Sequence, residues 1–233
     1  EERIEGFQLS VVESDAFIDI KPSEIPSLVT DLTVHLSEDA KLEIRSRSGN
    51  VTVEQMGGGL RVAGTSGDVR ISQCQGALEL STSSGQMTLT DIDSTSTTIE
   101  NKCGDIAITA FQGELNVRSA SGDIKVEEFR GRSIALEAVS GDIHLVGSSP
   151  FEGNMTLRTV SGDARVHLPQ GSSAKVTLST LSGDVTSELE LSEQENQHRR
   201  ITGNLGSGAG SIDISAVAGD IHVSTVKVAA ATS

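Results

Sequence analysis

The tripeptide Ser-Gly-Asp and its close variants return along this chain at a nearly constant interval. Successive repeat glycines are 18 to 21 residues apart, except for a last gap of 36 residues, about twice the basic step. A period near twenty is typical of repeat architectures, in which each unit is one supersecondary element stacked on its neighbour. The repeat glycines are Gly49, Gly67, Gly85, Gly104, Gly122, Gly141, Gly162, Gly183 and Gly219.

The residues on both sides of each repeat glycine alternate between apolar and polar. Positions two and four after it are mostly Val, Ile or Leu, and so are positions five and seven before it. This alternation with β-branched residues predicts half-buried strands, and the Thr, Val, Ser and Gly content excludes helices from the repeats. The sequence therefore predicts an all-β fold: a single-stranded parallel β-helix (β-solenoid) with about 18–21 residues and two strands per coil.

A second set of glycines, nine residues after the repeat glycine, indicates where the chain folds back. Glycine reaches positive φ at low steric cost, as a tight corner requires. Each coil therefore reads as a strand, a Gly-Asp corner, a second strand and a second corner. The second-corner glycines are Gly58, Gly76, Gly113, Gly131 and Gly171.

Two stretches lack the repeat and set the predicted organisation. Residues 1–41 contain irregular strand-like runs, which we expect to cap the N-terminal edge of the solenoid. Residues 42–228 form the repeats, and the polar and Gly-rich residues 188–210 within them are predicted to be an inserted loop or hairpin. Residues 229–233 are expected to be a frayed tail. The whole is predicted to be one structural domain.

Composition argues against several classes of partner. The net charge is −15, with 33 acidic and 18 basic residues and no basic cluster, so nucleic acid is not an expected partner. The chain contains no Trp or Tyr, so it lacks the aromatic platforms on which sugars or bases usually stack. No apolar run approaches the ~18 residues of a spanning helix, so we expect membrane attachment only through an anchor outside this segment. The first residues do not resemble a signal peptide.

A column of aspartates follows the repeat glycines and is the candidate metal site. Stacked at the coil spacing, neighbouring carboxylates would repel by roughly 1 kcal/mol per pair in water, which Ca²⁺ could relieve. The alternative, which we prefer, is that each carboxylate accepts hydrogen bonds from N–H groups of the corner. No other cofactor is expected. The candidates are Asp105, Asp123, Asp142, Asp163 and Asp184.

No constellation for catalysis is evident. The serines that precede the repeat glycines have no histidine near them in this scheme, so they read as turn-capping hydroxyls rather than nucleophiles. His144 and His167 fall in adjacent coils without a third ligand, which favours surface histidines over a metal site. Cys74 and Cys103 occupy different columns, so no disulfide is expected. We therefore expect no enzymatic activity.

An apolar stripe interrupts the outward face in the later repeats. Two residues before the repeat glycine, the early coils carry mostly polar residues, whereas the later coils carry Val139, Val160, Leu181 and Val217. Exposed apolar stripes often mark contacts. Two interpretations remain open: residues 188–210 fold back over the stripe, or the stripe binds a protein partner or a second copy of the chain. A protein partner or self-association is favoured over a small molecule.

The recurrent Ser-Gly-Asp-Ile/Val-x-Val core resembles the bacterial DUF4097 family, also called toastrack or putative-adhesin repeat domains. Residues 32–37 leading into 42–50, residues 166–171, and residues 201–208 before 218–221 are also similar. The resemblance implies a right-handed, single-stranded β-helix-like domain, usually in the bacterial envelope and sometimes near envelope-stress signalling proteins. It implies no catalytic residues. The chain departs from the family pattern at Asn50, Gln86 and Cys103.

The expected function is that of a non-enzymatic, acidic β-solenoid in the cell envelope, an interaction, scaffold or adhesin-like module. One alternative is a carbohydrate-active β-helix enzyme, because polysaccharide lyases use parallel β-helices; the lack of Trp and Tyr counts against it. Another is a surface repeat protein stabilised by calcium.

Overall fold

The computed structural model describes residues 9–13, 18–22, 33–35, 37 and 39–226. Contacts divide the chain into two compact units, residues 1–36 and 37–233, where the sequence indicated one domain. The first unit contains an antiparallel pair, β1 (Leu9–Glu13) and β2 (Ile18–Pro22), whose strands satisfy each other's backbone hydrogen bonds. The capping role of residues 1–41 stays a prediction, and the tail 229–233 lies outside the described residues.

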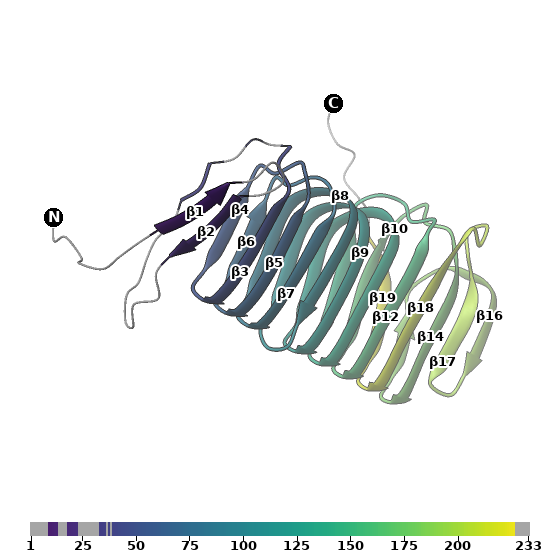
Figure 1. The fold of residues 1–233 in the computed structure, drawn as a ribbon. Coiled ribbons are helices and arrows are strands. Elements are labelled where there is room, and N and C mark those ends of the chain that lie inside the picture. Colours follow the sequence, from purple (N-terminus) through teal and green to yellow (C-terminus); the bar gives the residue numbers. More distant parts are fainter. Residues whose placement is uncertain (1–8, 14–17, 23–32, 36, 38, 227–233) are drawn as a thin grey trace. The chain divides into compact units, whose positions relative to one another are not determined.

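The second unit is a stack of parallel coils, and the predicted β-solenoid is confirmed (Figure 1). Three long strands run through most of a coil each: β8 (Met87–Asn101), β9 (Ile106–Ser121) and β10 (Ile124–Ser140). Elsewhere one face is built from separate strands that end at the repeat glycine: β3 (Leu42–Ser48), β5 (Leu60–Ser66), β7 (Leu78–Ser84), β12 (Asn154–Ser161), β14 (Ala174–Ser182) and β18 (Gly210–Ala218). The next face is built from β4 (Val51–Glu54), β6 (Val69–Ser72), β11 (Ile143–Gly147), β13 (Ala164–Pro169), β15 (Val185–Ser187) and β19 (Ile221–Val226).

The apolar columns form continuous files in the interior. Ile124 lies beside Ile143, and Ile143 beside Ala164, in the register of the parallel ladders. The file continues through Ile221 to Val185. All but Val185 are almost fully buried, and burying one such aliphatic side chain stabilises the fold by about 1.5–3 kcal/mol. Each coil contributes one residue to each of these interior files, and the apolar contacts between successive residues of a file hold the stack together.

Each early coil has a further bend that the sequence did not reveal. Six residues after the repeat glycine, the backbone has a positive φ of 53° to 57° at non-glycine residues. The next residue then points inward and is buried, and two of these, Phe111 and Phe129, stack with ring centroids 6.1 Å apart. The bend lets β8, β9 and β10 turn without ending. The bend residues are Gln55, Gln73, Asp91, Ala110 and Glu128.

The coils do not stack throughout in the order of the chain. β12 pairs with β18, and β18 pairs with β14, so the coil of β18 and β19 lies between two coils that precede it in sequence. Figure 1 shows β18 in yellow between β12 and β14. Within the predicted insertion, β16 (Leu191–Gln197) and β17 (Arg200–Leu205) form an antiparallel hairpin, and β17 pairs with the outer edge of β14. The long last gap therefore holds a hairpin that covers a strand edge, and the chain then returns inward.

Candidate functional site

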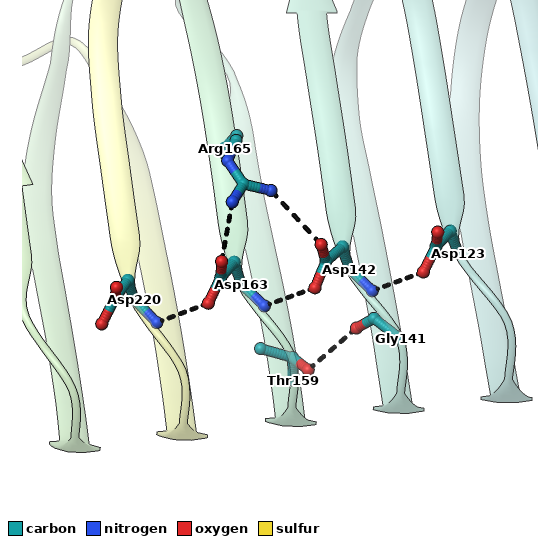
Figure 2. Close-up of polar contacts among 7 residues, drawn as sticks. All are labelled: Asp123, Gly141, Asp142, Thr159, Asp163, Arg165 and Asp220. Carbon is teal, nitrogen blue, oxygen red and sulfur yellow. Dashed lines mark hydrogen bonds and ion pairs between the residues drawn. The ribbon is translucent and has the colours of Figure 1, made fainter.

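The aspartates of the repeat form a hydrogen-bonded ladder along the corner (Figure 2). The backbone N–H of Asp142 donates to Oδ1 of Asp123, and that of Asp163 to Oδ1 of Asp142, both at 2.8 Å. The donor thus belongs to the next coil, rather than to the carboxylate's own corner. Hydrogen bonds to charged groups contribute about 1.5–3 kcal/mol each, more than the repulsion between neighbouring carboxylates.

The ladder follows the spatial order of the coils. Asp105 precedes Asp123 in it, because the Asp123 N–H donates to Oδ1 of Asp105 at 3.0 Å. Asp163 and Asp184, neighbours in the sequence pattern, are separated by Asp220, which donates to Asp163 and accepts from the Asp184 N–H, both at 2.9 Å. The structure therefore brings all five candidate aspartates to one edge and adds a sixth between the last two.

The second carboxylate oxygens do not assemble an evident cation site. Arg165 donates to Oδ2 of Asp163 at 2.7 Å and to Oδ2 of Asp142 at 3.3 Å (Figure 2). Within the described part of the chain, no group of three or more His, Cys, Asp or Glu side chains is placed to hold a metal ion. Calcium stabilisation therefore remains an alternative that rests on the sequence pattern alone.

The departures from the aspartate pattern show what the carboxylate does in the ladder. Asn50 accepts the Asp68 N–H at 3.0 Å through its amide Oδ1, so an amide can replace a carboxylate there. At the coil where Gln86 stands in the column, buried Asn101 donates instead to the carbonyls of Gly85 and Gly104, at 3.2 and 2.9 Å. In both cases a side-chain hydrogen bond joins one corner to the next.

The repeat glycines are required by two separate constraints. Their φ angles are positive, +121° at Gly122 for example, where side chains are strained. A Cβ at Gly122 would also stand 2.6 Å from the carbonyl carbon of Gly104 in the preceding coil. Gly49, in the first repeat, has φ +111° but nothing within 4 Å of the same position. The close approach of one corner to the next is therefore part of the stacking itself.

The predicted apolar stripe is exposed and continuous. Its residues are 56% (Val139), 48% (Val160), 46% (Val217) and 70% (Leu181) exposed. The strand register places them on four successive coils, with Val217 between Val160 and Leu181. We call these four residues the apolar ladder. The prediction that residues 188–210 fold over it is wrong for the described residues, because β17 instead continues the sheet at the edge of β14.

Charged side chains flank the apolar ladder. Two positions earlier on β10 and β12, Glu137 and Arg158 contact each other at 4.0 Å, and Arg118 on the adjacent strand β9 contacts Glu137 at 3.1 Å and Glu100 at 3.9 Å. At the far end, Arg199 donates to the carbonyl of Leu181 at 2.7 Å. All these ion pairs are more than a third exposed, so each contributes little to stability. Glu137 and Arg158 thus lie beside Val139 and Val160, whereas Ser215 and Ser179 take the equivalent positions beside Val217 and Leu181.

The two histidines that the sequence placed in adjacent coils contact each other. The His144 and His167 ring centroids are 5.3 Å apart in an edge-to-face arrangement. Partial burial, followed by the nearby His167, lowers the pKa of His144. Nδ1 of His167 hydrogen-bonds the buried hydroxyl of Ser224 at 2.7 Å, a pair that the sequence did not indicate because Ser224 lies outside the serine column. Among the described residues, no carboxylate contacts His167 to orient it as a catalytic base.

The two cysteines differ in burial and form no disulfide. Cys74 is buried and Cys103 exposed, and both are free. Burial raises the pKa of the Cys74 thiol, so it is a poor nucleophile. No helix long and apolar enough to cross a bilayer occurs in the described part of the chain.

Comparison with known proteins gives one positive result. No curated protein and no solved structure matches this chain. A family model described as Toastrack DUF4097 matches residues 25–149 and again residues 77–224. The two matches overlap and together cover most of the chain, including every repeat glycine. With its repeated Gly-Asp corners and stacked coils, the chain belongs to the Toastrack DUF4097 family.

Proposed function

We propose that this protein is a non-enzymatic scaffold or interaction module of the bacterial cell envelope, and that the apolar ladder is its contact surface. The observation that carries the proposal is the row of four exposed apolar side chains on successive coils of an otherwise polar face. Single exposed apolar residues are ordinary, whereas a contiguous row bordered by charges is typical of a binding site. The location in the envelope follows from the family resemblance.

The spacing of the apolar ladder favours a helix as the partner element. Its side chains repeat at about 4.8 Å, so three steps span ~14 Å. Three turns of an α-helix laid along the stack span ~16 Å. The same-face residues of an extended strand repeat at ~6.7 Å and would run ahead by ~6 Å over three steps. An amphipathic helix can therefore place one apolar residue per turn against each rung.

Charge favours a partner other than a second copy. The chain carries a net charge of −15, so two copies side by side repel each other. Glu137 and Arg158 beside Val139 and Val160, with Arg118 on the next strand, offer both signs of charge to the flanks of a helix at that end of the apolar ladder. We therefore expect a helix with a narrow apolar stripe and mixed or basic flanks.

Site-specific photo-crosslinking in bacterial cells tests this proposal. A photoreactive amino acid replaces Val160 in the apolar ladder or, as the control, Thr65, which lies in the same column on an early coil. We expect a discrete crosslinked protein from position 160 and none from position 65. Val139→Ser with Leu181→Ser should abolish that crosslink while leaving the melting temperature unchanged, because both side chains are exposed. Equal crosslinking at both positions would refute the proposal. A crosslink to a second copy of the chain would show that the apolar ladder mediates self-association and would refute the helical partner.

A further inference from the structure

The last coil of the described chain, β18 and β19, occupies a slot between two earlier coils. Met155 pairs with Ile212, and Ile212 pairs in turn with Val176 on the other side. On the next face, Ile221 lies between Ala164 and Val185. The last coil is thus in register with both neighbours, parallel to both, and contributes hydrogen bonds along two strand edges. Figure 1 shows it as the yellow rung inside the green end of the stack.

A short loop is the covalent link that brings the last coil into the slot. β17 lies on one edge of β14 and β18 on the other, so residues 206–209 must cross over β14, a span of two strand spacings or ~10 Å. The loop is fixed to Ser173, whose Oγ contacts the Ser207 hydroxyl at 2.8 Å and accepts the Ala209 N–H at 3.2 Å. Gly206 and Gly208 have φ of +59° and +72°. Few contacts, all local, therefore determine the path of this link.

The last coil cannot leave the slot without a replacement. Ile212, Ile214, Ile221 and Val223 are each at most 1% exposed, and the slot without them would expose two strand edges and the interior files. A second copy of the chain carries the same coil with the same side chains. If two copies exchange their last coils, every contact of the coil is reproduced, and only the loop 206–209 changes its path.

We propose that the last coil is exchanged between two copies of this chain, so that the slot of each copy receives residues 210–226 of the other. The hydrogen-bonded ladder of corner aspartates (the corner ladder) is then completed across chains, because Asp220 of one copy lies between Asp163 and Asp184 of the other. Val217 likewise supplies the third rung of the other copy's apolar ladder. The net charge of −15 opposes the exchange, as it opposes any association of two copies, so salt that screens this repulsion should raise the exchanged fraction. This inference does not depend on what the apolar ladder binds.

A disulfide between copies detects the exchange directly. Thr156 and Asp213 are register partners on β12 and β18, and neighbouring strands bring their Cα atoms to ~4.8 Å, within the range for a disulfide. In a Cys103→Ser background, one full-length sample carries Thr156→Cys and the other Asp213→Cys. The samples are unfolded, mixed, refolded at high concentration and mildly oxidised. We expect a disulfide-linked heterodimer, separated by mass from either homodimer.

Two control pairs make the result decisive. Thr98→Cys mixed with Asp213→Cys uses the same outward column on a coil far from the slot, and measures random linkage. The double variant with Thr156→Cys and Asp213→Cys on one chain shows that the pair can form a disulfide: an exchanged dimer links two chains, whereas an unexchanged chain links within a monomer. A mixed pair that links several-fold more than the Thr98→Cys control supports exchange. Linkage equal to that control, with efficient linkage inside the double variant, overturns the proposal.

Shortening the loop gives a second, independent measurement. Deleting Ser207 and Gly208 leaves three Cα–Cα steps from Leu205 to Gly210, a reach of ~11 Å at full extension, which leaves no slack to cross over Ser173. We expect light scattering to show that the dimer fraction rises at least several-fold over the unaltered chain, and rises further with salt. A folded monomer with unchanged melting would overturn the proposal. If the deletion prevents folding, the disulfide experiment decides alone.

Discussion

Replacing Gly122 by Ala tests whether the corners must touch for the coils to stack. The backbone strain of an alanine at φ +121° costs roughly 1–3 kcal/mol. The added methyl would also stand 2.6 Å from the Gly104 carbonyl carbon, so one corner must move by roughly 1 Å to reach ordinary contact. That movement strains the N–H donations of Gly122 to Ser140 and of Asp123 to Asp105. Overpacking and a weakened hydrogen bond each add roughly 1–3 kcal/mol, so we expect a total loss of about 3–9 kcal/mol.

Gly49→Ala is the matched control for the strain alone. Its φ is +111° and its Cβ position is empty, so we expect a loss of only about 1–3 kcal/mol. Urea unfolding followed by circular dichroism gives both values, provided the m-value does not change. The loss of stability can also depend on where a coil lies in the stack. Val53→Ala and Val126→Ala measure that dependence, because the two valines are equivalent buried residues in the coils of Gly49 and Gly122. If Gly49→Ala costs as much as Gly122→Ala after that correction, contact between corners is not what fixes these glycines.

Four further predictions concern other parts of the stack. Asp123→Asn should change the free energy of unfolding by no more than about 0.5 kcal/mol, because Asn50 already accepts the equivalent hydrogen bond through its amide oxygen. Asp123→Ala removes the acceptor and should cost about 1–3 kcal/mol. Equal effects of the two substitutions in urea unfolding would contradict a role of this carboxylate in the ladder. Ala110→Gly should stabilise by roughly 0.5–1 kcal/mol, since it relieves a φ of 54°, and a lower urea midpoint would contradict this. Because the pKa of His144 is lowered in the folded state, the unfolded chain binds more protons, so stability should fall as the pH drops below about 6.5, and His144→Gln should flatten that slope in pH-dependent melts. Calcium or EDTA at millimolar concentration should not shift the melting temperature, because one carboxylate oxygen of Asp105, Asp123, Asp142, Asp163 and Asp220 already accepts a hydrogen bond. A rise of several degrees with calcium would favour the stabilised-repeat alternative.

The strands and the glycine corners could be predicted because each is encoded by a residue type at a fixed interval. Val and Ile recur at positions that only a strand of period two would bury, and glycine recurs where φ is positive. The bend after each second strand could not be predicted, because Gln55, Asp91 and Ala110 share no chemistry that indicates a left-handed backbone. Only the buried residues that follow them, such as Phe111 and Phe129, give a weak apolar signal.

The order of the coils was hidden for a related reason. Ile212 and Val176 fit the same column equally well, so the alternation identifies both as members of the stack without assigning their places. The apolar ladder was visible in the sequence as a set of residues, but the position of Val217 between Val160 and Leu181 required the pairing of β18. The donors of the corner ladder were missed because bonds between coils do not follow from spacing within one coil.

The interior position of residues 210–226 has a consequence for synthesis. These residues leave the ribosome after β14 and β15, although they form a layer beneath them, and N-terminal segments generally fold first during translation. A nascent chain that has reached Leu205 can complete the coils up to β13, but the layer on which β14 rests has not yet been made. Residues 174–226 should therefore acquire protease resistance in one late step, whereas the preceding coils can become protected one after another.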